Sequence, residues 1–242
     1  MRWIYLSPHL DDAALSAGGW IYDQTQAGIP VEVWTIMCGF PKTRKLSPFA
    51  NYLHDQWGMS SAREVVSGRR IEDKNAAAIL GAKARHLGFL DCIYRQDGNG
   101  DFLYYSIFVD PLPGEGDLPR RIAESIAARL KPDDELICQL GVGKHIDHVT
   151  VRLAAELLGR PLHYVADIPY LFNYPEQLKP KKAGMKKKVE RVSKAGLGAW
   201  KEAVLAYESQ VSMLFKSPGR ARKAINEYCL NMGGMAFWHK NP

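Results

Sequence analysis

The sequence predicts an α/β protein: a single Rossmann-like domain with a mostly parallel sheet flanked by helices. Short β-prone runs alternate with longer helical patterns through most of the chain. One polar cluster directly follows the first β-prone run, and a second follows the fourth. The 242 residues are 46% hydrophobic and 24% charged, which is typical of one globular domain. We therefore expect residues 1–242 to form one domain.

Five strands are expected, most of them rich in β-branched or aromatic residues. They are residues 3–6, 31–37, 84–89, 136–140 and 162–165. Pro8 ends the first strand because proline cannot donate a hydrogen bond to a neighbouring strand. Because the strands alternate with crossover helices, they should run parallel, with their carboxyl ends at the edge of the sheet where α/β proteins bind ligands.

Six helices are expected from periodicity and capping residues. They are residues 13–27, 62–80, 117–130, 148–158, 199–214 and 218–230. Ser61 and Glu64 have the spacing of a capping box at the start of the second helix. Gly18 and Gly19 weaken the first helix, so we expect it to pack closely against the sheet there. The stretches 38–58, 95–117 and 166–184 are expected to be irregular.

Composition excludes several classes of protein. The four cysteines form no C-x-x-C pair, so neither a zinc finger nor a redox dithiol is supported. There is no apolar segment of signal-peptide or membrane-span length, and we expect a cytoplasmic protein without a membrane span. The net charge of +6 permits an anionic substrate without indicating a nucleic-acid partner. The basic run Lys179–Lys188 is either a solvated surface or an attractant for a phosphate-bearing substrate.

The first polar cluster contains His9, Asp11 and Asp12, directly after the first strand. One aspartate could simply cap the following helix, but capping leaves the histidine and the other aspartate unexplained. The second cluster, His145-Ile146-Asp147-His148, follows the fourth strand in the same way. His9, one aspartate and one of the later histidines would give two nitrogen ligands and one oxygen ligand. Such a set suits Zn²⁺ with an open fourth position, and we expect this metal site at the C-terminal ends of the strands.

Together, Pro8-His9-Leu10-Asp11-Asp12 and His145-Ile146-Asp147-His148 resemble the paired motifs of the PIG-L/LmbE-like de-N-acetylases. The usual motifs of this family are P-H-P-D-D and H-P-D-H or H-x-x-H, so Leu10 and Ile146 each replace a proline. Weaker matches are Arg70-x-Glu72, Leu87-Gly88-Phe89-Leu90-Asp91 and Tyr207-x-Ser209-Gln210. The resemblance covers most of residues 1–215. It implies a zinc-dependent hydrolase that removes the N-acetyl group from an N-acetylglucosamine-containing conjugate.

The resemblance also implies a role for each matching residue. His9, Asp12 and His148 would be the ligands of Zn²⁺, or of another divalent transition metal such as Fe²⁺. Asp11 would be the general base. His145 would stabilise the oxyanion or protonate the amine, and Asp147 would orient His145 and keep it cationic when needed.

The resemblance places one arginine of the second helix near the substrate sugar. Of Arg69 and Arg70, Arg70 fits the R-x-E pattern better, although both could be solvated helix charges. Asp91 would also lie near the sugar, or could equally be a loop residue that binds its own backbone. Some family members have a tyrosine two residues before the first histidine of the second motif. Here Gly143 occupies that position, so a phenol would have to come from elsewhere, with Tyr52 and Tyr170 as candidates.

Two alternatives to this function stay open. The first keeps the zinc amidase chemistry but changes the substrate to another acylated amino sugar or a thiol conjugate. The second is a non-catalytic α/β protein that binds a sugar or nucleotide, although no G-x-G-x-x-G follows the first strand and no G-x-S-x-G occurs. The expected partner is a small-molecule amino-sugar conjugate, and the oligomeric state, a homo-oligomer included, is left open.

Overall fold

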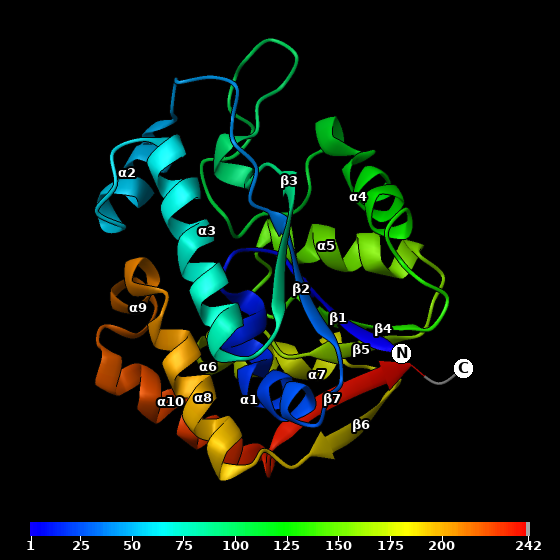
Figure 1. The fold of residues 1–242 in the computed structure, drawn as a ribbon. Helices are drawn as coiled ribbons and strands as arrows, with labels where there is room; N and C mark the ends of the chain where they lie inside the picture. Colours follow the sequence, from blue (N-terminus) through cyan, green and yellow to red (C-terminus); the bar gives the residue numbers. More distant parts are fainter. Residues whose placement is uncertain (241–242) are drawn as a thin grey trace.

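A computed structural model describes residues 1–240 and contains one seven-stranded sheet with the strand order β3-β2-β1-β4-β5-β7-β6 (Figure 1). The strands are β1 (Arg2–Ser7), β2 (Val31–Met37), β3 (Lys83–Phe89), β4 (Asp134–Gln139), β5 (Leu162–Val165), β6 (Met185–Glu190) and β7 (Met235–Lys240). The first five are parallel where they pair, and β7 is antiparallel to both β5 and β6. The expected single α/β domain with a mostly parallel sheet is therefore confirmed.

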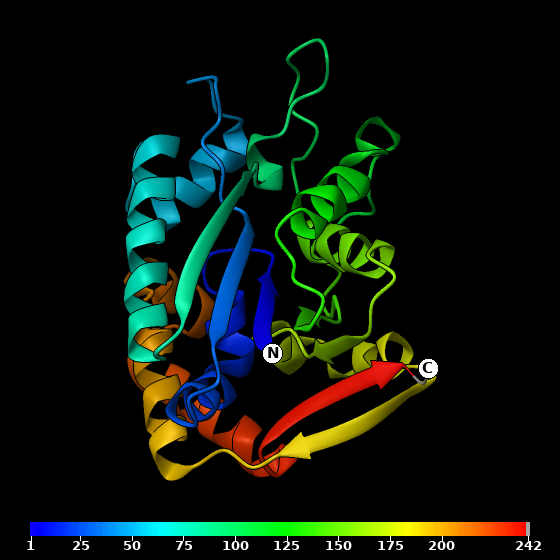
Figure 2. The same ribbon diagram turned by 45° about the vertical axis from the view of Figure 1, so that its right-hand side comes forward.

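Helices cover both faces of the sheet, and Figure 2 shows α3 and the C-terminal helices on one side and α4 and α5 on the other. They are α1 (Asp12–Gln26), α2 (Pro48–Gln56), α3 (Ala62–Ile79), α4 (Leu118–Ala127), α5 (Ile146–Leu157), α6 (Tyr170–Asn173), α7 (Leu178–Lys181), α8 (Lys194–Leu205), α9 (Glu208–Phe215) and α10 (Pro218–Met232). Short 3₁₀ turns η1 (Cys92–Tyr94), η2 (Pro113–Glu115) and η3 (Pro175–Gln177) interrupt the loops. In the described part of the chain, no helix combines the length and the apolar character that a membrane crossing requires.

The strand order creates a switch point between β1 and β4. From β1 the chain proceeds through α1 to β2 on one side, and from β4 it proceeds through α5 to β5 on the other. The segments that follow these two neighbouring strands therefore diverge at the carboxyl edge and leave a crevice between them, the usual ligand position in open α/β sheets. The two polar clusters of the sequence lie at this crevice.

The glycine pair in α1 packs against another helix, and the expectation of contact with the sheet is wrong. A Cβ atom at Gly18 would lie 2.6 Å from Cδ1 of Trp200 in α8, and one at Gly19 would lie 2.8 Å from Cε3 of the same ring. Trp200 is fully buried and donates from its indole nitrogen to the carbonyl of Leu15. The two glycines, Gly18 and Gly19, thus leave room in α1 for the Trp200 indole of α8.

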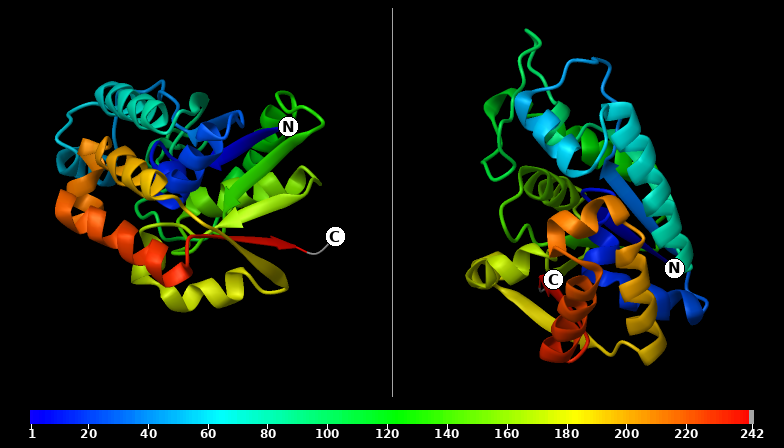
Figure 3. Two further views of the ribbon diagram at one scale, coloured as in Figure 1. Left: turned by 60° about the horizontal axis from the view of Figure 1, so that its bottom comes forward. Right: turned by 90° about the vertical axis from the view of Figure 1, so that its left-hand side faces the viewer.

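The C-terminal part of the chain differs most from the sequence-based expectation. The single helix expected at 199–214 is divided into α8 and α9, and β6 and β7 were not expected. Nearer the N-terminus, α2 lies within the stretch 38–58 that was expected to be irregular. Figure 3 shows this antiparallel strand pair continuing the sheet beyond β5. Strand β6 carries three of the six lysines of the basic run, and exposed lysines on an edge strand hinder pairing with other chains. This position favours the solvated-surface interpretation.

Three residues of the weaker family matches, Glu72, Tyr207 and Ser209, make contacts that hold α3 to the C-terminal helices. Asp73 of α3 accepts from the Tyr207 hydroxyl at 2.9 Å, and its other oxygen lies 2.8 Å from His86 Nε2. Glu72 accepts from both the backbone nitrogen and the hydroxyl of Ser209, at 2.8 and 2.7 Å. These side chains fix where α9 crosses the carboxyl edge of the sheet, so they shape the site without belonging to its chemistry.

A half-buried arginine joins three strands at the opposite, amino edge. Arg2 of β1 contacts Asp134 of β4 through two nitrogens, at 3.0 and 2.6 Å, and Glu32 of β2 at 2.7 Å. The side chain of Asp134 is fully buried. Burial opposes the ionisation of both carboxyls, but hydrogen bonds, including those with Arg2, lower the pKa of Asp134 and of Glu32. The fork therefore fixes the alignment of the central strands.

We expect Arg2→Ala to lower the free energy of unfolding by about 3 kcal/mol at pH 7, because it leaves a buried carboxylate unpaired. Carboxyls with a depressed folded-state pKa stabilise the fold above their unfolded pKa, and this stabilisation is lost as the pH falls through the folded value. The difference between variant and wild type should therefore shrink in acid, as measured by urea unfolding at pH 7 and near pH 3. Arg120→Ala, which breaks an exposed pair with Glu124, should cost less than about 0.5 kcal/mol. Equal costs for the two variants would contradict the assignment.

Candidate metal centre and active site

The first cluster is held in a tight turn between β1 and α1. The Ser7 hydroxyl donates to the carbonyl of His9 at 2.7 Å and accepts from the backbone nitrogen of Ala13 at 3.0 Å. The backbone nitrogen of His9 donates to Asp12 Oδ2 at 2.8 Å. Asp11 stands at the N-cap position, but its side chain makes no capping hydrogen bond. The capping interpretation therefore does not account for Asp11, whose carboxylate faces the crevice.

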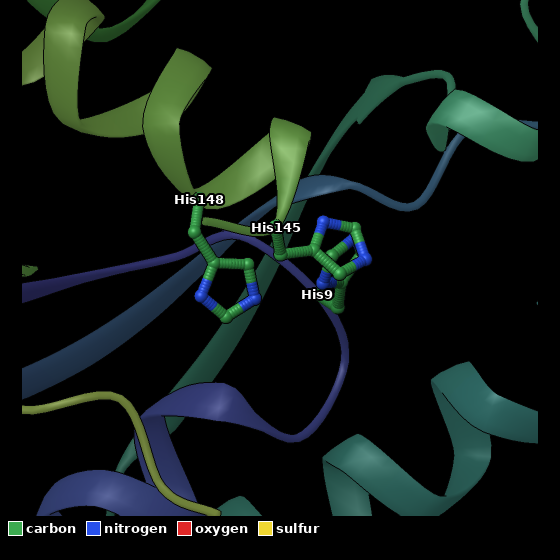
Figure 4. A group of neighbouring side chains, drawn as sticks. All are labelled: His9, His145 and His148. Carbon is green, nitrogen blue, oxygen red and sulfur yellow. The ribbon is translucent and has the colours of Figure 1, made fainter. Parts of the chain in front are cut away.

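The second cluster begins α5 after a loop that requires unusual backbone angles. Gly141, Gly143 and Lys144 all have positive φ. Asp167, which follows β5, accepts from the backbone nitrogens of Gly141 and Val142 at 3.1 and 2.8 Å and so holds the loop in place. The loop brings the first turn of α5, with its two histidines, against the turn that follows β1 (Figure 4).

Three of the predicted residues converge on one point. Asp12 Oδ2 lies 3.2 Å from His9 Nδ1 and 3.3 Å from His148 Nε2. Ligands about 2.0–2.2 Å from a tetrahedral Zn²⁺ are about 3.4 Å from one another, so this spacing fits a shared ion. His148 Nε2 is buried and has no hydrogen-bond partner among the described residues, so a metal ion would take no existing hydrogen bond from it. The donor atoms, two imidazole nitrogens and a carboxylate oxygen, are those that zinc binds in catalytic sites.

The opposite nitrogen of each of these histidines is held by a carboxylate. His9 Nε2 lies 3.0 Å from Asp147 Oδ2, and His148 Nδ1 lies 2.7 Å from Asp167 Oδ1. Such carboxylates fix the ring orientation and the tautomer of metal-binding histidines. Asp167 was missed by the sequence reasoning, although its position just after the fifth strand, at the same edge as the two clusters, was a usable signal.

Other donor sets in the site are less well suited to a metal. Ring nitrogens of His9, His145 and His148 lie within 4.8 Å of one another, and a second group of that kind contains Cys92, His145 and Asp147. Burial raises the pKa of the Cys92 thiol well above its usual value, which disfavours the thiolate that binds metals. The Asp147 carboxylate is already engaged by His9 and by Arg95.

The expected role of Asp147 needs correction. Its carboxylate contacts His9 Nε2, Arg95 Nη1 and the backbone nitrogen of Cys92, and it makes no hydrogen bond to His145. Instead, the backbone nitrogen of Asp147 donates to His145 Nδ1 at 3.2 Å. The side chain turns inward because the buried guanidinium of Arg95, from a loop distant in sequence, lies there. Asp147 thus orients the first histidine of the site.

Burial and neighbouring charges set different protonation states across the site. Burial raises the pKa of Asp11 to about 6, even though the nearby Arg69 guanidinium opposes the rise. Burial, together with the charges of His9 and His148, lowers the pKa of His145 well below its usual value. The charge of Asp147 opposes that shift, as expected, but does not overcome it. These surroundings favour a neutral His145 ring over the expected cationic one, and the role of His145 stays a prediction.

Arg69, and not Arg70, reaches the site. Arg69 is buried, its Nη2 lies 3.5 Å from Asp11 Oδ1, and its guanidinium lies over the ring of Trp57. Arg70 instead donates to the carbonyl of Cys38 at 2.6 and 3.1 Å and lies over Phe40. Successive residues of a helix point about 100° apart, so only one of the pair can face the crevice.

A cavity of about 110 Å³ opens onto this group of residues. Its polar lining includes Asp11, Arg69, Asp91 and His145, and its apolar lining comes from loops, α2 and α9. Asp91 binds its own backbone, as one interpretation expected, because Oδ1 accepts from the backbone nitrogen of Ile93. Its Oδ2 lies 3.8 Å from His9 Nε2, and a role toward the sugar stays a prediction. Of the predicted site residues, His9 and Asp12 also line the cavity, whereas His148, Asp147 and Arg70 do not.

Tyr170 fills the space left by Gly143. A Cβ atom at Gly143 would lie 2.8 Å from Tyr170 Cβ, and the Tyr170 ring lies 5.3 Å from the ring of His148. The phenol lines the cavity, and burial raises its pKa well above the usual value, so it keeps its proton. Tyr52, the other candidate, is 58% exposed on α2 and does not line the cavity.

The comparisons with known proteins agree with these features. A family model described as PIG-L, GlcNAc-PI de-N-acetylase, matches residues 4–158. A teicoplanin deacetylase, solved in a zinc-inhibited form, is 28% identical, with a TM-score of 0.85 over 99% of this chain and 97% of the other. A deacetylase of an antimicrobial pseudoaglycone is 30% identical, with a TM-score of 0.79 over 98% of this chain and 96% of the other.

A more distant structure shares the fold. The N,N'-diacetylchitobiose deacetylase from Pyrococcus horikoshii is 15% identical, with a TM-score of 0.60 over 98% of this chain and 81% of the other. Among curated proteins, no sequence matches this chain significantly.

We expect Asp167→Asn to weaken Zn²⁺ binding by about 10–100-fold, because the histidine that Asp167 orients would lose its fixed tautomer. Competition with a chromophoric chelator measures the affinity directly. Glu135→Gln is the matched control, because Glu135 contacts His163 at 3.2 Å in another histidine–carboxylate pair outside the cavity. Wild-type affinity in Asp167→Asn would mean that His148 is not a ligand.

Proposed function

We propose that this chain, which belongs to the PIG-L family and is a metal-dependent deacetylase, removes the N-acetyl group from an N-acetylglucosamine-containing conjugate. His9, Asp12 and His148 would hold Zn²⁺, with Fe²⁺ as the alternative metal. The observation that carries the proposal is the position of Asp12 Oδ2 between two imidazole nitrogens, with a second carboxylate, Asp11, beside it. The PIG-L domain would include the whole chain, and the cytoplasmic location stays a prediction.

When bound, Zn²⁺ polarises a carbonyl oxygen and lowers the pKa of a bound water to about 7. Asp11 is the base that accepts a proton from the attacking water, because it lies in the cavity and its pKa, raised to about 6, is close to neutral. Arg69 next to it keeps the carboxylate oriented and partly compensates its charge. Once protonated, Asp11 can pass the proton to the leaving amine.

His145 is a neutral hydrogen-bond donor in this scheme. Its Nδ1 accepts from the backbone nitrogen of Asp147, so the proton of the neutral ring lies on Nε2. That N–H and the Tyr170 hydroxyl are two donors for the substrate carbonyl oxygen, where negative charge develops. The proposal for Tyr170 rests on its place against Gly143 and in the lining of the cavity.

The surroundings of the cavity favour a substrate with apolar parts. The ring of Phe108, which is 46% exposed, lies 6.3 Å from His145, 5.9 Å from Tyr170 and 6.2 Å from Tyr174. Aromatic faces suit the apolar faces of sugar rings and of aromatic or acyl groups. A second candidate substrate is therefore another acylated amino sugar. It is favoured by the 28–30% identity with deacetylases of teicoplanin and of an antimicrobial pseudoaglycone.

Acetate release from a panel of N-acetylglucosamine conjugates, with metal content measured in parallel, tests the function. We expect the zinc-loaded wild type to release acetate and Asp11→Asn to keep its metal but lose most turnover, because it loses only the proton acceptor. Asp12→Asn should lose metal affinity as well. Full turnover and normal zinc content in both variants would contradict the assignments, and no release from any acylated amino sugar would contradict the function.

The neutral-donor role of His145 gives a second prediction. His145→Ala should keep its zinc and lose about 10²–10³ in turnover, as other oxyanion donors do. His145→Gln should lose less, because its amide can still donate a hydrogen bond. The opposite result would be an equal loss of turnover in His145→Ala and His145→Gln, together with the absence from both of a basic limb that the wild-type pH–rate profile shows. That result would mean that the His145 ring acts as a cationic acid.

A further inference from the structure

We propose that Arg95 is a positioning residue that, through Asp147, sets the orientation of the His9 ring in the metal centre. This inference rests on the proposed function, because it takes His9 Nδ1 as a zinc ligand. Arg95 lies outside the paired motifs and does not line the substrate cavity, but it is buried, with 7% of its surface exposed.

A short series of contacts joins Arg95 to the metal-binding nitrogen. Arg95 Nη1 lies 2.6 Å from Asp147 Oδ1, and the other carboxylate oxygen, Oδ2, lies 3.0 Å from His9 Nε2. The backbone nitrogen of Cys92 donates to the same Oδ2 at 3.0 Å. Oδ1 of Asp147 is held by its ion pair with Arg95, and Oδ2 by His9 and the Cys92 backbone nitrogen, so a rotation of the carboxylate would break these contacts. The direction of His9 Nδ1 toward Asp12 follows from that fixed carboxylate.

Arg95 is itself fixed by groups from the loop between η1 and α4. Glu115 pairs with Arg95 Nε, and the Tyr104 hydroxyl donates to Glu115 at 2.6 Å. The Tyr104 ring lies 5.1 Å from the guanidinium carbon, and the carbonyl of Leu90 accepts from Nη1 at 3.2 Å. The guanidinium thus lies between two carboxylates, which gives it a role that depends on its charge as well as on its packing.

Removal of the guanidinium would leave Asp147 Oδ1 buried with no cation beside it. A buried carboxylate without a partner is costly, so it would move toward other donors or admit water. Either change loosens the His9 ring while leaving His9, Asp12 and His148 present. The expected defect is therefore in metal geometry and affinity.

Arg95 borders a cavity that is separate from the substrate cavity. This cavity of about 420 Å³ is lined by Arg95 together with Gln96, Leu103, Glu115 and Arg121. Arg95 Nη2 is buried and has no hydrogen-bond partner among the described residues. In an Arg95→Ala variant, a free guanidinium ion could therefore enter from this side and occupy the vacated position.

The test compares Zn²⁺ affinity and the d–d absorption spectrum of the Co²⁺-substituted protein, both measured without substrate. We expect Arg95→Ala to bind Zn²⁺ about 10–100-fold more weakly and to change the Co²⁺ spectrum. Millimolar guanidinium should restore both readouts, while urea, a neutral molecule of the same shape, should not. Arg121→Ala is the matched control, because Arg121 lines the same cavity and is not among the residues that contact Asp147, and it should behave as the wild type.

Wild-type affinity and spectrum in folded Arg95→Ala would overturn the proposal, and so would equal effects of guanidinium and urea. Arg95→Lys, which keeps a cation near Asp147, is the second variant if Arg95→Ala does not fold. It should lose less zinc affinity than Asp147→Ala, and an equal loss would overturn the proposal. Failure of the proposed function is seen separately, because the wild type itself would then fail to bind zinc or to release acetate.

Discussion

The site depends on one oxygen atom, Asp12 Oδ2, which lies close to both His9 Nδ1 and His148 Nε2. It also accepts a hydrogen bond from the backbone nitrogen of His9. Four carboxylates, those of Asp11, Asp12, Asp147 and Asp167, are buried around it. Burial of so much negative charge is unfavourable unless cations compensate it. Arg69 and Arg95 supply part of that compensation, and a divalent ion between the histidines would supply the rest.

The sheet topology is what allows so few residues to form this site. Strands β1 and β4 are neighbours, but the helices that follow them lie on opposite faces, so the two turns meet across the crevice. Each turn is encoded locally, by a strand, a polar cluster and a helix start. For that reason the sequence patterns predicted the fold class, the five parallel strands and the convergence of His9 with one aspartate and one later histidine. The choice of Asp12 and His148 came from the resemblance to the family. Their role as metal ligands stays a prediction.

The features that the sequence did not predict depend on contacts between distant segments. Whether Arg69 or Arg70 faces the cavity depends on how α3 is rotated about its axis, and the R-x-E pattern does not specify this rotation. Asp147 turns toward His9 because Arg95, 52 positions earlier in the chain, lies on that side. Strand β7 takes its place only by pairing with β5 and β6, so its short apolar run had no local signal that distinguished it from a buried loop.

The same contacts explain how three histidines within one small volume can have different roles. His9 and His148 each have a carboxylate on the nitrogen opposite Asp12. Asp12, together with that second carboxylate, raises the pKa of each ring against the effect of burial. Such electron-rich rings are good metal ligands. His145 has only a backbone N–H on its Nδ1, and the two neighbouring histidines add to the effect of burial, so its ring stays neutral. In the proposed mechanism a neutral His145 ring with its proton on Nε2 acts as a donor, because its Nδ1 already accepts a backbone N–H. The partner of the second nitrogen therefore distinguishes the roles proposed for the three histidines.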